Sequence, residues 1–439
     1  MGEHEMGRLP THPRGRTQIA LALSVLMLGA LLLRVHAVWQ RIHDSPEQPA
    51  VRMVGDESGY EALADALLHG SFFQSPVRVP VYPLFIAGVY YALGGRSPAK
   101  LLYVQAFVGV LVIPLTYILA RRFTGVIPAL VAVGVVAVDD LLIDQARYIY
   151  AEILYTPLFL VALLALLWAL QAPRLWRFAG AGASMAVVSL CRPTSVLLPV
   201  ILPLLLPWDW SLKRKAGVCL AYGLTMVAVI APWTYHNWRT FHRFLPLSIS
   251  GGALWQGSPE FYHLRQRQRN MADIWAHELN PQRNGGYDPH TIDGDRYFNR
   301  RGLQSIQAEP MVYIKYSLQK AVHLWVGWTY WEMYDWHMRR SWFSYPPLKV
   351  FRILVARQLP VVALAALVFL TVRGRIRPLV PFVAIFAYFT LVHMISWAEM
   401  RYTEPLHPLL AIIVVTAASE AFNLLKGRRG DAALQTARR

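Results

Sequence analysis

Three carboxylate side chains stand where acid-base chemistry could take place. Asp56 and Glu57 lie together in a polar stretch between apolar runs, and Glu152 stands at the start of another apolar run. A carboxylate held at a membrane surface can take a proton from an attacking hydroxyl group as a general base. Asp56 also precedes an amphipathic segment that ends near Gly70, so capping of a helix is an equally simple role for it. Solvation at a helix end is the alternative for Glu152.

Isolated arginines form a second group of candidates. Arg78, Arg192 and Arg401 each stand beside an apolar run. A guanidinium group binds phosphate through paired hydrogen bonds and stabilises it as a leaving group. Snorkelling toward water or pairing with nearby acids is the alternative. Tyr82 and Tyr402 follow two of these arginines and complete the predicted substrate-binding set.

Other residue classes provide weaker signals. The segment 323–337 is rich in Trp and Tyr, which is typical of anchoring at the level of lipid headgroups, with stacking on a sugar as the alternative. The 14 histidines show no HExxH or other ligand spacing, so the residues predict no metal site of the zinc-hydrolase kind. No glycine-rich nucleotide loop is present, so the sequence does not favour an ATPase or a nucleotide-sugar enzyme.

Apolar runs dominate the chain and must position these side chains. Of 439 residues, 55% are hydrophobic and 16% are charged, whereas a soluble protein has about 25% charged residues. An apolar run of about 20 residues crosses a bilayer as a helix. The sequence therefore predicts an all-α polytopic membrane protein with about ten spans, at 17–39, 98–120, 124–143, 148–171, 177–191, 193–208, 215–233, 355–372, 376–397 and 405–425.

The positions of Lys and Arg predict the sidedness, because short cytoplasmic loops are enriched in them. If the run 79–93 lies flat on the outer face, eighteen cations fall in short inner segments and only Arg147, Arg192 and Arg401 in short outer turns. Both termini are then cytoplasmic, and 40–97 and 234–354 are outer segments. The net charge of +17 thus reflects the membrane topology of the chain and does not indicate a nucleic-acid partner.

This topology divides the chain into three regions. Residues 1–233 form a seven-span catalytic module that includes outer loop 40–97 with juxtamembrane helices, and 234–354 form a long extracytoplasmic loop. Residues 355–439 hold three C-terminal spans and a basic cytoplasmic tail.

Taken in order, several motifs resemble the bacterial family-39-like membrane glycosyltransferases of the GT-C fold, which are related to protein O-mannosyltransferases and lipid A aminoarabinose transferases. The resemblance covers nearly the whole chain, although each motif alone has low specificity. It rests on Asp56-Glu57, RVPVYPLF at 78–85, Ala151-Glu152, Cys191-Arg192-Pro193, GGALWQG at 251–257 and RYTEPL at 401–406. Two departures are His236-Asn237, where the family commonly has Arg-Asn, and a C-terminus without a soluble outer domain, which suggests a small acceptor or one held elsewhere.

The resemblance implies a function and roles for the matching residues. Asp56 would be the catalytic base, and Glu57 and Glu152 would be accompanying acids that orient the acceptor or hold a divalent cation. The enzyme would be a hexosyl- or pentosyltransferase that moves a sugar from a polyprenyl-phosphate donor to a hydroxyl of a lipid, glycan or protein, by one inverting displacement. It would lie in the bacterial cytoplasmic (inner) membrane, with its site facing the periplasm or exterior.

Two other functions remain open at this point. A lipid-linked saccharide ligase or polymerase would share the fold and the outer-face chemistry. A membrane transporter or lipid flippase would favour paired acids deep inside spans and inverted repeats, and the sequence shows neither.

Overall fold

The computed structural model describes residues 13–437 except 44–52, 54, 268–273, 275–276, 279–284 and 328–346. Within these ranges the chain forms helices and no strands. This confirms the all-α class that the apolar runs predict.

Seven helical segments in the described ranges are long and apolar enough to cross a membrane. They comprise α1 (Pro13–His43), α4 with α5 (Pro98–Val110 and Val112–Ala120), α8 (Glu152–Ala169), α11 (Leu212–Phe241), α19 (Pro347–Val372), α20 (Val380–Ile395) and α21 (His407–Ala437). A further pair, α6 (Val126–Val138) and α7 (Asp140–Asp144) continued by a 3-10 turn, passes the same test with a bend of 52°.

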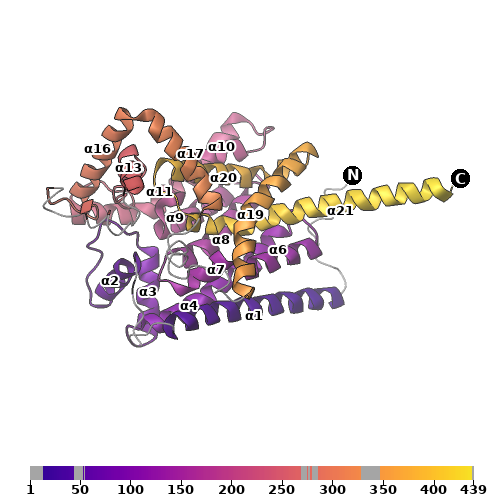
Figure 1. Ribbon diagram of the computed structural model, residues 1–439, viewed down its shortest axis with the longest axis horizontal. Helices are drawn as coiled ribbons and strands as arrows, with labels where there is room; N and C mark the ends of the chain where they lie inside the picture. Colours follow the sequence, from indigo (N-terminus) through magenta and orange to yellow (C-terminus); the bar gives the residue numbers. More distant parts are fainter. Residues whose placement is uncertain are drawn as a thin grey trace.

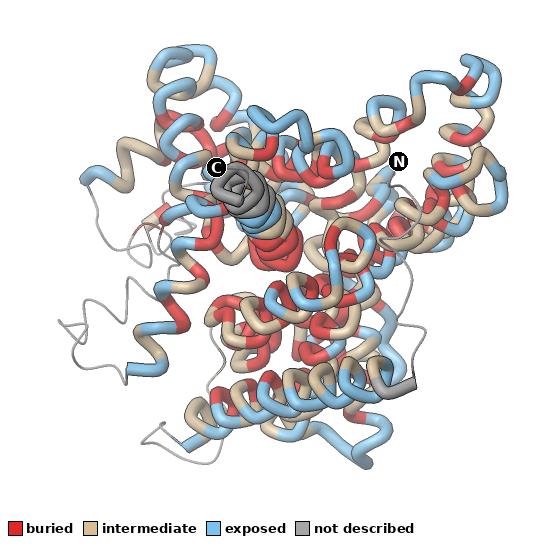
Figure 2. Tube along the Cα trace, turned by 90° about the vertical axis from the view of Figure 1, so that its right-hand side faces the viewer, coloured by how far each residue is buried: buried red, intermediate tan, exposed pale blue. Residues whose placement is uncertain are grey.

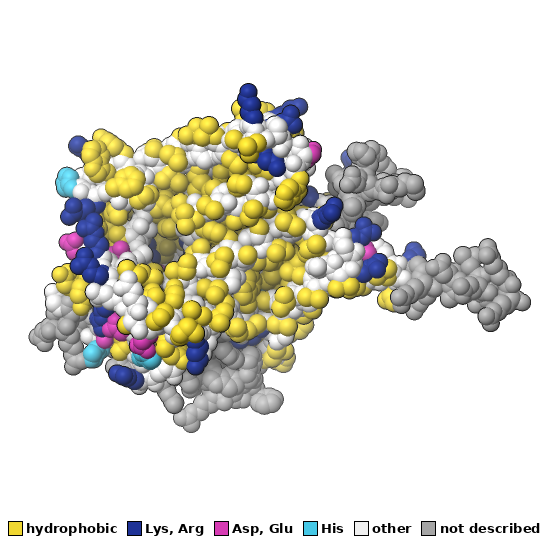
Figure 3. Space-filling model, turned by 90° about the horizontal axis from the view of Figure 1, so that it is seen from above, with side chains coloured by type: hydrophobic (Ala, Val, Ile, Leu, Met, Phe, Trp, Pro, Cys, Tyr) yellow, Lys and Arg dark blue, Asp and Glu magenta, His cyan; other side chains and the backbone are white. Residues whose placement is uncertain are grey.

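The outer surface of this bundle is apolar, as a lipid-facing surface must be. On α1 the exposed large hydrophobic side chains are Leu21, Val25, Leu28, Leu32 and Trp39, and this spacing places them on one face of a helix. Buried positions lie where helices face one another (Figure 2). In Figure 3, hydrophobic side chains cover the middle of the visible face, and charged side chains gather toward both ends. The molecule therefore has the surface of a multi-pass membrane protein.

Two predicted spans differ from single straight helices. The run 193–208 forms two 3-10 turns and the short helix α10 (Leu202–Leu205), because the prolines at 193, 199 and 203 interrupt the helical hydrogen bonds. The run 124–143 breaks at Asp139, whose side chain accepts hydrogen bonds from the backbone N–H groups of Leu141 and Leu142. The described residues thus hold seven continuous spans and one bent span, and the predicted spans 177–191 and 193–208 form the shorter apolar helices 175–191 and 193–205. Helix α9 (Leu175–Cys191) occupies the first half of the predicted hairpin.

Helix α9 packs very closely on α11. A Cβ atom added to Gly182 would lie 2.2 Å from the backbone oxygen of Tyr222. Small residues allow membrane helices to approach one another in this way. This contact holds the middle of α9 against α11, and Arg192 follows the C-terminal end of α9.

The two helices expected in the first outer loop are both present. Helix α2 (Glu57–Leu68) buries Leu63 and Ala64, as its apolar stripe predicts. Helix α3 (Val81–Ala92) has 12 residues, a length of about 18 Å, which is too short for a hydrocarbon core of about 30 Å.

The long segment after α11 also forms helices, namely α12 (Ala253–Gln256), α13 (Pro259–Arg267), α16 (Ile292–Ala308) and α17 (Pro310–Val326). Figure 1 shows α2, α3, α13 and α16 at one end of the molecule, while the C-terminal part of α21 projects from the other end. Most of the aromatic segment 323–337 lies outside the described residues.

Candidate active site

A cavity of about 700 Å³ lies between the helix bundle and the segment that follows α11. Asp56, Arg78, Arg192, Arg401 and Tyr402 all line it. These residues come from the first outer loop, the end of α9 and the 3-10 segment Met400–Leu406. Five of the eight site residues that the sequence predicts therefore share one cavity.

Asp56 stands at the N-cap position of α2, but its side chain makes no capping hydrogen bond. It accepts a hydrogen bond from Nη2 of Arg78 at 2.7 Å, and Nη2 of Arg401 lies 3.8 Å from its other oxygen. The side chain is 42% exposed. The structure therefore favours a role in the cavity over the capping role.

The charge around Asp56 keeps it ionised. Burial of the carboxylate acts to raise its pKa, but Arg78 and Arg401 outweigh this effect, with a further contribution from Arg192, and the net pKa is lowered. An opposite charge within a few ångströms favours the charged form of a carboxyl group. Asp56 is thus a carboxylate, the charge state that a general base requires.

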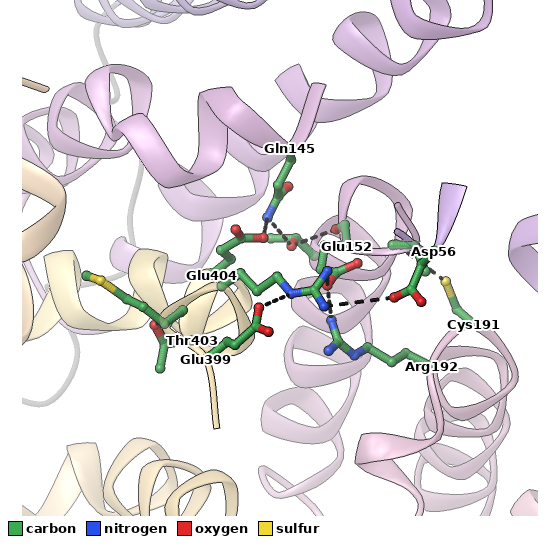
Figure 4. Close-up of polar contacts among 12 residues, drawn as sticks. Asp56, Gln145, Glu152, Cys191, Arg192, Glu399, Thr403 and Glu404 are labelled. Atoms are coloured by element: carbon green, nitrogen blue, oxygen red, sulfur yellow. Dashed lines mark hydrogen bonds and ion pairs between the residues drawn. The ribbon is translucent and has the colours of Figure 1, made fainter. Parts of the chain in front are cut away.

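Glu152 lies deeper, behind the arginines. Its Oε1 is 2.5 Å from Nη1 of Arg192 and 4.0 Å from Nη1 of Arg401. Nε of Arg401 lies 2.7 Å from Oε2 of Glu399. Figure 4 shows Asp56, Glu152, Arg192 and Glu399 directed toward one another. Arg401 therefore connects the acids of three different chain segments.

A second, much smaller cavity of about 30 Å³ adjoins this cluster. Gln145, Glu152, Arg401 and Glu404 are among the residues that line it, and Nε2 of Gln145 donates a hydrogen bond to Glu404 at 2.8 Å. Such a volume has room for about one water molecule.

Glu57 does not line the large cavity. It is fully buried, and its two oxygens accept hydrogen bonds from Arg41 at 2.8 and 2.7 Å and from the backbone N–H of Ile149 at 2.7 Å. These contacts connect the end of α1 to the first outer loop and to the chain before α8. Glu57 is therefore placed to hold the loop that carries Asp56.

We expect Glu57→Gln to destabilise the protein by about 3 kcal/mol, because it leaves the buried guanidinium of Arg41 without its anionic partner. Thermal unfolding of the purified protein in detergent measures this. The double variant Arg41→Gln/Glu57→Gln should recover part of the loss, since it removes both charges. A Glu57→Gln protein with unchanged thermal stability would contradict this structural role.

The two predicted tyrosines have different positions. Tyr82 is fully buried and donates a hydrogen bond to Gln105, so it belongs to the packing between α3 and α4 and does not line the cavity. Tyr402 lines the cavity, and the guanidinium groups of Arg192 and Arg401 lie 4.6 and 5.2 Å from the centre of its ring. Tyr402 therefore fixes the positions of two arginines.

The opposite wall of the cavity comes from residues that the sequence did not single out as site residues. Ser250, Gly251, Ala253 and Gln256 line it. Helix α16 holds this wall, because Asp295 accepts hydrogen bonds from the hydroxyl of Ser250 at 2.7 Å and from the backbone N–H of Gly252 at 2.8 Å. The GGALWQG motif was the only signal for this wall in the sequence.

His393 is another residue that the sequence did not indicate. It lines the cavity from the end of α20. The sequence could have indicated this residue in one way. Its imidazole stands within an otherwise apolar run, where polar groups are costly and often functional.

The acids do not fit a divalent cation in this arrangement. Asp56, Glu57 and Glu152 each lie within 2.8 Å of a guanidinium group, from Arg78, Arg41 and Arg192 respectively. These positive charges oppose a further cation, and the described residues hold no group of three His, Cys, Asp or Glu side chains that could bind a metal ion. We derive no step of the reaction through a metal.

The fold and this cavity define a class of protein. The chain is a polytopic membrane protein with the GT-C fold, as the sequence motifs predict. The family model described as dolichyl-phosphate-mannose-protein mannosyltransferase matches residues 76–236. That stretch includes Arg78, Glu152 and Arg192, but neither Asp56 nor Arg401.

Solved structures show the same fold. The oligosaccharyltransferase of Archaeoglobus fulgidus tethered with an acceptor peptide has a TM-score of 0.58 at 14% identity, over 94% of this chain and 50% of that one. The Archaeoglobus fulgidus enzyme AglB in complex with an inhibitory peptide and a dolichol-phosphate gives 0.55 at 15% identity, over 97% and 52%. The chain thus spans about half the length of these proteins.

ArnT from Cupriavidus metallidurans, bound to undecaprenyl phosphate, has a TM-score of 0.41 at 16% identity, over 89% of this chain and 77% of that one. A search of curated proteins gave no match.

Proposed function

We propose that the protein transfers a sugar from a polyprenyl-phosphate donor to a hydroxyl group of an acceptor, on the extracytoplasmic face of the membrane. One observation carries the proposal. The carboxylate of Asp56 makes no capping hydrogen bond to α2. It lines a cavity that is also lined by Arg78, Arg192 and Arg401. A base beside a cluster of cations matches a displacement in which phosphate leaves.

The residues divide the reaction between them. The acceptor oxygen bonds to the anomeric carbon while Asp56 takes the hydroxyl proton. The bond between that carbon and the phosphate oxygen breaks, and the phosphate departs with the electron pair. Attack opposite to the leaving group inverts the anomeric carbon. A single base is sufficient because no covalent sugar intermediate forms.

The charges favour the transition state over the bound donor. The donor phosphate is a diester with one negative charge, and it gains charge as it leaves. At the same time Asp56 becomes neutral, so Arg78 and Arg401 lose an anionic partner while the phosphate acquires charge. An interaction that strengthens during the reaction accelerates it. This coupling is supported by the contacts of Asp56 with Arg78 and Arg401, at 2.7 and 3.8 Å.

Two features of the fold support an outer-face location. Asp56 and Arg78, which line the cavity, come just before α2 and α3, and Figure 1 shows α2, α3 and α16 at one end of the molecule. The distribution of Lys and Arg along the sequence favours an exterior location for that end. We therefore place the site toward the periplasm or exterior and both termini toward the cytoplasm.

Purified protein in lipid nanodiscs tests the function directly. Undecaprenyl phosphate that carries a radiolabelled hexose or pentose is incubated with lipid, glycan and peptide acceptors, and the products are separated. We expect label on an acceptor and release of undecaprenyl phosphate. Movement of the intact labelled lipid across the bilayer, with no glycosylated product, would instead show a flippase.

The lowered pKa of Asp56 predicts how transfer depends on pH. The base acts only when ionised, so kcat/KM for the donor should fall on the acidic side only below pH of about 4, the ordinary value for aspartate. Arg78→Met removes the first of the charges that lower this pKa, so the acidic limb should move to higher pH. Arg78→Lys keeps a charge and should move it less. An acidic limb that stays in place in Arg78→Met would contradict this account.

A further inference from the structure

His393 carries a buried nitrogen atom that lacks a hydrogen-bond partner. The residue lines the large cavity but is only 5% exposed. Its Nδ1 lies 3.2 Å from the backbone oxygen of Trp397, and its Nε2 has no partner among the described residues. A buried polar atom without a partner destabilises the fold, so each such atom requires an explanation.

The contact with Trp397 assigns the proton of the ring. A carbonyl oxygen only accepts hydrogen bonds, so Nδ1 must carry the hydrogen. In a neutral imidazole, Nε2 then holds a lone pair and acts as an acceptor. The missing partner of His393 is therefore a hydrogen-bond donor.

The position of the ring narrows the choice of that donor. His393 stacks on Tyr402, with ring centres 4.6 Å apart, and Tyr402 supports Arg192 and Arg401. The imidazole thus lies close to Arg192 and Arg401, the two arginines proposed to hold the phosphate. Ionised phosphate oxygens offer only lone pairs, which an acceptor nitrogen repels. A hydroxyl group of the sugar next to that phosphate has the required hydrogen.

We propose that His393 determines specificity for the donor by accepting, through Nε2, a hydrogen bond from a hydroxyl group of the donor sugar. This inference rests on the proposed function. Through this hydrogen bond, His393 would allow the protein to distinguish the lipid phosphate that carries a sugar from the bare lipid phosphate that the reaction releases.

Two substitutions separate recognition of the sugar from a purely structural role. The amide of Asn can replace Nδ1 of histidine and keep the bond to Trp397, but it cannot reach the position of Nε2. The longer Gln can place an amide oxygen near Nε2. Recognition of the sugar predicts that His393→Gln binds the donor better than His393→Asn, and a structural role predicts the reverse order.

The experiment measures binding to the full chain in nanodiscs. The probes are undecaprenyl phosphate and the same lipid carrying each of several hexoses and pentoses. For the sugar-bearing lipid that binds most tightly, His393→Asn should weaken binding about three- to tenfold, the effect of losing one neutral hydrogen bond. Binding of bare undecaprenyl phosphate should not change. Removing the recognised hydroxyl from the sugar should weaken binding to the wild type but not to His393→Asn.

Each other result has a defined meaning. A wild-type protein that binds neither lipid would refute the proposed function, and this inference with it. A wild type that binds both lipids equally, or an Asn variant that binds the sugar-bearing lipid as well as the wild type does, would overturn the inference alone. If His393→Gln bound the sugar-bearing lipid more weakly than His393→Asn did, the role of His393 would be structural.

Discussion

Asp56→Asn should reduce sugar transfer by about 10²- to 10⁴-fold, the contribution of a general base. The amide has nearly the same size and can still accept the hydrogen bond that Nη2 of Arg78 donates at 2.7 Å. It cannot take the proton of the attacking hydroxyl. The measurement is the rate of transfer from labelled undecaprenyl-phosphate sugar by purified protein.

Asp65→Asn is the matched control, because Asp65 belongs to the same helix and does not line the cavity. It should transfer at the wild-type rate. Thermal unfolding should show both variants folded. Normal turnover in the Asp56→Asn protein would remove Asp56 as the base and with it the main support for the proposed mechanism.

Arg401→Met should lower kcat/KM for the donor by about 10²- to 10³-fold, the usual effect of removing a group that stabilises charge in a transition state. Arg401 is the cation that lies near Asp56, Glu152 and Glu399 together. Arg401→Lys should recover only part of the loss, because an ammonium group cannot bridge several oxygens as a planar guanidinium does.

The control for charge is Arg243→Met, which removes an exposed cation outside the cavity. If Arg401→Met acted only by weakening the general attraction of the protein for anionic lipid, Arg243→Met would have a comparable effect. Equal activities of the two variants would count against a phosphate site at Arg401. Binding of undecaprenyl phosphate should weaken in Arg401→Met alone.

The sequence predicts most of the fold because bilayer-crossing helices depend on local composition. The long runs at 17–39, 98–120 and 215–233 appear as α1, α4 with α5, and α11. The run 193–208 departs from a single helix because it holds prolines at 193, 199 and 203, whereas α8, α11 and α19 each hold one internal proline and stay continuous. Hydropathy counts proline as nearly neutral, whereas the backbone loses a hydrogen bond at each one.

The site was predictable only in part because its residues are far apart in the chain. Asp56, Arg192 and Arg401 could be found because charged residues are scarce beside apolar runs. The same signal also selected Glu57, and it could not show that Arg41 binds this side chain away from the cavity. The wall at 250–256 has no comparable signal, since small polar residues are common in every loop.

The two walls of the cavity differ in how they are held. Arg192 and Arg401 extend from the packed bundle, whereas the facing wall at 250–256 depends on hydrogen bonds to Asp295 and Asn299 of α16. Changes at those few contacts can reshape the entrance without moving the arginines. Under the proposed function, the arginines that would hold the leaving phosphate are thus held independently of the facing wall, and that wall can change in sequence while the arginines stay fixed.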